Sequence, residues 1–154
     1  MKEYKIENHV SSFLPKEKKW KLVWSDEFDG DRLDMTKWNI ESGSTATVIK
    51  SQDNVKVENG DCVITLRRNH PTDGYEYSSS YVTTANKFSF CYGRLEFRAK
   101  LPVGQGVWPA LWTLGDNYLE IANDEKGWPL CGEIDVMELV GSSNPQNPFD
   151  NKKI

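Results

Sequence analysis

Three carboxylates lie within six residues towards the C-terminal end of the sequence. Glu133, Asp135 and Glu138 stand in the segment Gly-Glu-Ile-Asp-Val-Met-Glu-Leu, among apolar residues that are typical of a β-strand. Carboxylates in an apolar strand cost free energy unless they are paired or hydrogen-bonded. Two carboxylates are also the groups that cleave glycosidic bonds, one as nucleophile and one as general acid/base. The segment therefore indicates either a strand with its acids in water or a hydrolytic site.

The spacing of the acids separates these two interpretations. Side chains alternate between the faces of a regular strand, so Glu133 and Asp135 share a face and Glu138 points the other way. A β-bulge at Val136 or Met137 would return Glu138 to the face of Glu133. The two glutamates would then lie roughly 13 Å apart along the strand, at about 3.3 Å per residue. Side chains leaning together can close this to the roughly 5 to 5.5 Å of a retaining glycosidase.

The expected chemistry is a double displacement. One glutamate attacks the anomeric carbon, while the other protonates the leaving oxygen and later activates water. Asp135 between them would hydrogen-bond the nucleophile, and its negative charge would help to keep the acid/base protonated until it is needed. No cofactor is required for this reaction.

The rest of the sequence predicts strands and turns. Leu95, Phe97 and Ala99 alternate with charged residues, which is the period-two pattern of a strand with one apolar face. No segment has sustained helical periodicity, apart from a short helix or inserted loop over 117–125. We therefore predict an all-β protein, with strands over 22–24, 38–41, 54–58, 62–68, 81–84, 88–100, 107–114 and 133–140.

The composition excludes several classes of protein. The 19 Lys and Arg against 23 Asp and Glu give a net charge of −4, without a basic block for a nucleic-acid partner. No apolar run approaches the roughly 18 residues of a membrane span. Residues 1–19 show no clear period and are expected to be an N-terminal extension to one domain over 20–154. Because residues 1–14 lack an apolar signal region, the sequence as written predicts a cytoplasmic location.

Several tryptophans stand close to the acids. Trp108 and Trp112 are four residues apart, so on a strand they share a face. They would form either a stacking platform for sugar rings or part of a core between two sheets. Trp128 lies in a Gly-Trp-Pro turn that leads into the acidic strand, where a large ring has less reason to be core.

Five segments of the sequence, in the same order as in the family, resemble glycoside hydrolase family 16. Within that family they are similar to the laminarinase-like branch, which includes endo-1,3-β-glucanases. The resemblance implies an antiparallel jelly-roll β-sandwich of the concanavalin-like kind, with a concave face that binds a polysaccharide substrate. It also implies retaining hydrolysis of internal bonds in a 1,3-linked or mixed 1,3-1,4-linked β-glucan, and a secreted location as the alternative. The segments are 22–30 (Leu-Val-Trp-Ser-Asp-Glu-Phe-Asp-Gly), 54–60 (Asn-Val-Lys-Val-Glu-Asn-Gly), 92–102, 104–114 and 127–141.

The resemblance assigns roles to the acids. Glu133 matches the nucleophile, Asp135 the assisting acid and Glu138 the general acid/base. The additional Met137 is similar to the bulged version of the strand found in 1,3-β-glucanases, whereas the lichenase-type version lacks that residue.

Further positions match sugar-contacting residues of the family. These are Trp108, Trp112, Trp128 and Asn54. Tyr81 stands where laminarinase-like members often have an arginine, so a ring that stacks replaces a guanidinium that donates hydrogen bonds. This departure leaves a hydrolase of another β-linked polysaccharide, such as a galactan, as an open alternative.

The resemblance also implies a structural calcium site and further strands of the sandwich. Many members hold a structural calcium ion near Gly60 and Glu27, with an aspartate from the C-terminal part; without that match, Asp26, Glu27 and Asp29 are expected to form a solvated turn. Only 16 residues follow Glu138, whereas family members continue through several more strands. We therefore expect a truncated sandwich that self-associates or binds a complementary chain, with an inactive fragment or a glycan-binding module as alternatives.

Overall fold

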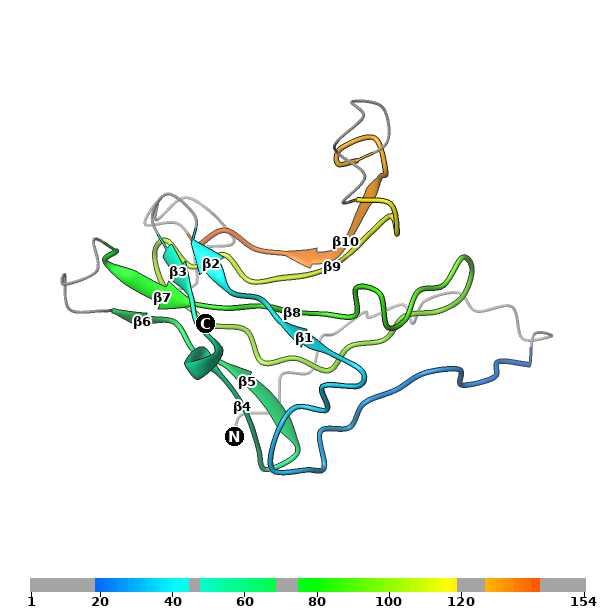
Figure 1. The fold of residues 1–154 in the computed structure, drawn as a ribbon, viewed down its shortest axis with the longest axis horizontal. Coiled ribbons are helices and arrows are strands. Elements are labelled where there is room, and N and C mark those ends of the chain that lie inside the picture. The colour runs from blue at the N-terminus through cyan, green and yellow to red at the C-terminus, as the bar shows by residue number, and fades with distance from the viewer. Residues whose placement is uncertain (1–18, 45–47, 69–74, 119–126, 142–154) are drawn as a thin grey trace, which may run out of the picture.

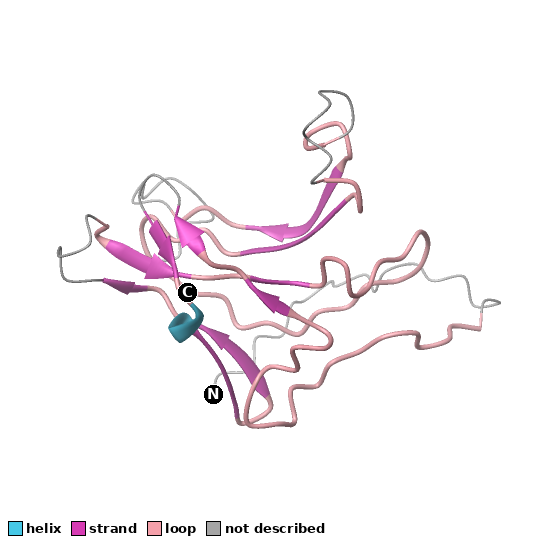
Figure 2. Ribbon diagram, in the orientation of Figure 1, coloured by secondary structure: helices cyan, strands magenta, loops and turns pink. Residues whose placement is uncertain are grey.

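The computed structural model describes residues 19–44, 48–68, 75–118 and 127–141. This part of the chain consists of short strands and one 3-10 turn, and it contains no α-helix (Figure 2). It therefore also lacks any helix that is long and apolar enough to cross a membrane. The strands are β1 (Asn39–Ile40), β2 (Gly43–Ser44), β3 (Val48–Lys50), β4 (Val55–Glu58), β5 (Asp61–Ile64), β6 (Arg67–Arg68), β7 (Tyr77–Ser79), β8 (Val82–Thr83), β9 (Ala110–Leu114) and β10 (Glu133–Glu138), and the 3-10 turn is Gln52–Asn54.

The strands form small separate sheets. One has four strands in the order β2-β3-β7-β6, and the others are the pairs β1–β8, β4–β5 and β9–β10. All of these pairs are antiparallel except β3–β7, which is parallel. In the view of Figure 1 the β9–β10 pair lies above the β1–β8 pair, and the β4–β5 hairpin lies below it. The acidic segment therefore belongs to a two-stranded ladder of its own.

Two predicted strands are not formed. Residues 22–24 and 88–100 have no hydrogen-bonded neighbour strand in the part of the chain that the structure describes. The apolar alternation around Leu95 and Phe97 is present, yet Phe97 is 43% exposed. A strand requires a partner to satisfy its backbone N–H and C=O groups, and a period-two sequence cannot supply that partner. The helix or loop expected over 117–125 falls mostly outside the described residues.

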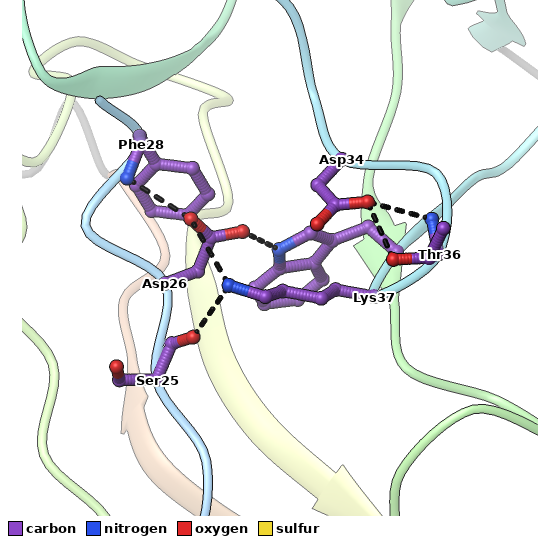
Figure 3. A network of polar contacts seen from close by, with 7 residues as sticks. Ser25, Asp26, Phe28, Asp34, Thr36 and Lys37 are labelled. Carbon is purple, nitrogen blue, oxygen red and sulfur yellow. Dashed lines mark hydrogen bonds and ion pairs between the residues drawn. The ribbon is translucent and has the colours of Figure 1, made fainter. Parts of the chain in front are cut away.

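Asp26 ties the segment before β1 to the strand that follows (Figure 3). Its carboxylate accepts hydrogen bonds from the Trp38 indole Nε1 at 2.8 Å and from the backbone N–H of Phe28 at 3.0 Å. The Lys37 ammonium lies 3.9 Å from the same carboxylate and donates to the Ser25 carbonyl. The Asp26 side chain is only 10% exposed. The prediction of a solvated turn is therefore wrong for Asp26, because the indole and ammonium donors come from residues 11 to 12 positions further along the chain.

Apolar burial is small in the described part of the molecule. Leu33 and Val57 are its buried apolar residues, each 6% exposed, whereas Ile134 and Val136 of β10 are 69% and 52% exposed. Large exposed apolar side chains on a strand mark a surface that another polypeptide covers in related folds.

Candidate active site

The register of β9 and β10 places the acidic residues. Glu133 pairs with Leu114, Asp135 pairs with Trp112, and Glu138 pairs with Ala110. A register shift lies between Asp135 and Met137, so Val136 is the additional residue of a β-bulge. The bulge predicted from the sequence is therefore confirmed.

The bulge brings all three acids to one face of the ladder. Their partners Ala110, Trp112 and Leu114 are two residues apart along β9 and therefore point to the same side. Paired residues of an antiparallel ladder share a face, so Glu133, Asp135 and Glu138 lie on that side as well. The opposite face carries Ile134 and Met137. The arrangement predicted from the sequence thus follows from the observed pairing.

Two close backbone approaches hold the ends of this ladder. A Cβ atom added to Gly115 would lie 2.3 Å from the Cys131 carbonyl oxygen. A Cβ atom added to Gly141 would lie 1.9 Å from the Gly104 carbonyl oxygen. Backbone hydrogen bonds accompany both approaches, from the Gly115 N–H to Gly132 and from the Gly141 N–H to Val107. Only glycine fits at these two positions, and together they fix the ladder at both ends.

Each glutamate accepts a hydrogen bond from an indole. Trp108 Nε1 donates to Glu138 Oε1 at 2.9 Å, and Trp128 Nε1 donates to Glu133 Oε2. Both tryptophans remain exposed, at 67% and 59%, so their ring faces are open to a ligand. The sequence predicted sugar contact for both rings but did not predict these hydrogen bonds. The indoles fix the positions of the two carboxylates at opposite ends of β10.

Comparison with known proteins gives the family. The profile of glycosyl hydrolases family 16 matches residues 42–151, which is more than half of the chain. The chain belongs to glycosyl hydrolase family 16. The catalytic domain of an endo-1,3-β-glucanase (laminarinase) from Thermotoga petrophila RKU-1 has a similar structure, with a TM-score of 0.72 and 43% identity, over 80% of this chain and 53% of that one. This likeness confirms the predicted jelly-roll β-sandwich and the laminarinase-like branch.

Two curated relatives of this chain have names that give different activities. The β-glucanase of Rhodothermus marinus is 41% identical over 130 residues, which cover 79% of this chain and 44% of the relative. The keratan-sulfate endo-1,4-β-galactosidase of Sphingobacterium multivorum is 35% identical over 132 residues, covering 81% of this chain and 30% of the relative. The chain thus spans less than half the length of both relatives.

The central acid of this family 16 site has a perturbed pKa. Desolvation raises the pKa of Asp135 above its usual value, and the neighbouring charges of Glu133 and Glu138 raise it further. Three acids on one face disfavour the charged form of the middle one. The ionised form of Asp135 is therefore less favourable in the folded chain than in the unfolded chain.

We expect Asp135→Asn to make the fold more resistant to heat at pH 7. A carboxyl with a raised pKa in the folded state binds more protons there than in the unfolded state, where the pKa is about 3.9. The parent should therefore lose stability as the pH rises from about 3.9 through the folded-state pKa, whereas the variant should not. Thermal unfolding at several pH values checks this, and the two proteins should agree near pH 3, where Asp135 is neutral in both states. An unfolding temperature of the variant at or below that of the parent at pH 7 would contradict the prediction.

Trp112 and Tyr81 lie together beside the acids. Their ring centroids are 6.4 Å apart with planes inclined at 52°, and Trp112 is the ladder partner of Asp135. Both rings are half-buried. The structure thus brings two of the predicted substrate-binding residues to the acidic cluster, Trp112 from β9 and Tyr81 from the connection between β7 and β8.

The prediction that Asn54 contacts a sugar is wrong. Its side chain is 2% exposed, and Nδ2 donates to the Thr65 carbonyl at 2.7 Å and to the Ser78 carbonyl at 3.2 Å. The amide therefore joins the residue before β4 to the residue after β5 and to the middle of β7, and it has no access to a ligand. Its position in a segment that resembles the family reflects this internal role.

The Gly60 carbonyl, a predicted calcium ligand, has a cation beside it. The Arg98 guanidinium lies 3.4 Å from the Gly60 carbonyl oxygen and 3.0 Å from Asp61 Oδ1. A cation already at this carbonyl repels a second one. Glu27 is exposed, and no group of three or more His, Cys, Asp and Glu side chains among the described residues is placed to hold a metal ion. Calcium at Gly60 and Glu27 therefore stays a prediction.

The sequence did not point to Lys50. This residue ends β3, and its ammonium lies 3.1 Å from the Tyr81 hydroxyl and 4.4 Å from the centre of the Tyr81 ring. The two residues are 31 positions apart and meet because β3 pairs with β7. No local pattern around Val-Ile-Lys predicts this contact, so only the folded chain could identify it.

Proposed function

We propose that this chain carries the catalytic strand of an endo-acting β-glucanase that cleaves internal bonds with retention of configuration. The observation that supports this most directly is the bulge in β10, which sets Glu133, Asp135 and Glu138 on one face of the β9–β10 ladder. Two glutamates with an exposed aromatic ring beside each are the parts that a retaining glycosidase needs.

The proposed reaction has two displacements. In the first, a Glu133 carboxylate oxygen bonds to the anomeric carbon while the bond to the leaving oxygen breaks, and Glu138 gives that oxygen its proton. In the second, Glu138 takes a proton from water, the water oxygen bonds to the anomeric carbon, and the ester to Glu133 breaks. Each step inverts the anomeric carbon, so the product retains the configuration of the substrate.

The surrounding residues support this assignment. The Trp128 and Trp108 indoles hold the two glutamates in place, so little reorientation is required when the substrate binds. Asp135 lies between the glutamates along the strand and can hydrogen-bond the nucleophile. Trp112 and Tyr81 offer ring faces on the same side of the ladder for the apolar face of a sugar.

The names of the relatives favour a β-glucan as substrate. The Rhodothermus marinus protein is a β-glucanase and the Thermotoga petrophila domain is an endo-1,3-β-glucanase. A galactan or a related polysaccharide is the second candidate, because Tyr81 replaces the expected arginine and the Sphingobacterium multivorum relative is an endo-galactosidase.

A second polypeptide segment is also part of the proposal. Ile134 and Val136 of β10 are exposed, and β10 pairs only with β9 among the described residues. Because the chain spans about half of the related laminarinase domain, we propose that further strands, from a complementary chain or a second copy, cover this face in the active protein.

Hydrolysis of a panel of polysaccharides tests the proposed function. Reducing ends are measured after incubation of the chain with a β-1,3-glucan, a mixed-linkage β-glucan and a galactan, with Glu133→Gln as the control. Release by the parent that is lost in the control supports a retaining site and identifies the polysaccharide. Binding without release would favour a glycan-binding module. An inert chain that unfolds without cooperativity would indicate an inactive fragment.

A further inference from the structure

We propose that Lys50 makes the part of the cleft beside Tyr81 and Trp112 a subsite for a sugar that carries an acidic group, either a sulfate ester or a carboxylate. This inference rests on the proposed function, because it concerns the substrate of the same cleft. Lys50 would add a positively charged side chain beside Tyr81 and Trp112, whose predicted contacts with sugar are aromatic.

The sheet topology places Lys50 beside Tyr81. Lys50 pairs with Ser79 in the parallel β3–β7 ladder, so their side chains share a face. Tyr81 follows the end of β7 by two residues, and its hydroxyl accepts a hydrogen bond from the Lys50 ammonium. The Lys50 ammonium lies 3.1 Å from the Tyr81 hydroxyl oxygen and 4.4 Å from the centre of its ring. The cation is thus held by both the hydroxyl and the π-face.

Tyr81 connects this cation to the acidic cluster. Its ring lies 6.4 Å from the Trp112 ring, and Trp112 is the ladder partner of Asp135. A sugar stacked against Tyr81 and Trp112 would therefore have the Lys50 ammonium within reach of its substituents.

The Lys50 charge has no carboxylate partner among the residues that the structure describes. No ion pair of this part of the chain includes Lys50, and the Glu41 carboxylate instead accepts a hydrogen bond from Thr83 at 3.3 Å. An ammonium has three N–H donors and Tyr81 accepts only one. A half-buried ammonium with free donors gains most from an oxyanion, through a charge-assisted hydrogen bond.

The charge of the whole chain makes this inference testable. A net charge of −4 repels polyanions in general. A preference for an acidic polymer over its neutral parent must therefore come from a local cation. If Lys50 instead serves only to hold the Tyr81 ring, its loss will weaken neutral and acidic ligands equally.

Binding to three soluble β-1,3-glucans of matched length separates these outcomes: unsubstituted, carboxymethylated and sulfated. Titration calorimetry uses the chain with Glu133→Gln, so that the polymers are not cut. We expect Lys50→Met to weaken binding of an acidic polymer about five- to tenfold, as for the loss of one charge-assisted hydrogen bond at a half-exposed site. Binding of the unsubstituted polymer should change less than about twofold. The acidic polymer with the larger loss identifies the preferred group.

Two further variants complete the test. Lys56→Met removes the same charge from an exposed lysine that pairs with Glu58 on β4, and it should leave all three affinities unchanged. Lys50→Arg keeps the charge and should retain most of the preference, which distinguishes loss of the cation from damage to the fold. Equal weakening of neutral and acidic polymers by Lys50→Met would overturn the inference while leaving the proposed function intact. Failure of the parent to bind any of the three would overturn both.

Discussion

Glu133→Ala is expected to lower kcat on a β-glucan by at least about 10³-fold, because the first displacement then has no nucleophile. Glu138→Ala should cause a loss of similar size on a polysaccharide, whose leaving oxygen must be protonated. Its loss should be much smaller on an aryl glycoside, whose leaving group departs without an acid. Initial rates on both substrates for the parent and the two variants measure these effects.

Added azide distinguishes the two glutamates. In Glu133→Ala, azide takes the place of the nucleophile in a single displacement, so the glycosyl azide has inverted configuration. In Glu138→Ala, azide attacks the intermediate on Glu133, so the product retains its configuration. Proton NMR of the anomeric signal reads the outcome. The opposite pair of products would exchange the roles assigned to Glu133 and Glu138. If azide restored activity in neither variant, the double displacement would be contradicted.

Deletion of Met137 is expected to leave a large part of the activity, within about tenfold of the parent. The deletion removes the residue that pairs with Leu111, so the bulged residue Val136 takes that position and the ladder becomes regular. The acids then occupy positions i, i+2 and i+4 of β10 and still share one face. Hydrolysis rates and thermal unfolding of the deletion variant check this expectation.

Deletion of Ile134 is the matched control, and it is expected to abolish activity, with a loss of about 10³-fold or more. It also shortens β10 by one residue, but it places Glu133 and Asp135 on opposite faces of the strand. A nucleophile on the wrong face cannot reach a sugar that Glu138 protonates. Equal losses for the two deletions would show that the length of β10, and not the side on which its acids lie, governs activity.

The sequence alone was enough to locate the acidic face. The five-residue separation of Glu133 and Glu138 is incompatible with a regular strand that presents both to a substrate, and the strand pattern left Val136 and Met137 as the sites of a bulge. Local spacing carries this information because side-chain direction in a strand depends only on parity. Local sequence also placed Trp128 in the turn that leads into the acidic strand, whereas Trp108 was predicted to contact sugar from the family resemblance.

Other features depended on long-range pairing. The period-two pattern around Leu95 and Phe97 predicted a strand that the described part of the chain does not form, because no neighbour supplies its hydrogen bonds. Asn54 lies in a segment typical of the family, yet its amide is used inside the protein, between Thr65 and Ser78. Whether a polar side chain faces a ligand or the interior depends on which strands pack around it.

The sequence by itself thus located the three acids of the proposed site, how they alternate along β10, and where a bulge must lie. Only the tertiary structure decided what surrounds them. The indole donors to Glu133 and Glu138, and the Lys50 ammonium on Tyr81, come from segments 5 to 31 residues away. Covalent geometry fixes the direction of neighbouring side chains in a strand, whereas contacts between strands follow from their pairing and register, which no local spacing encodes.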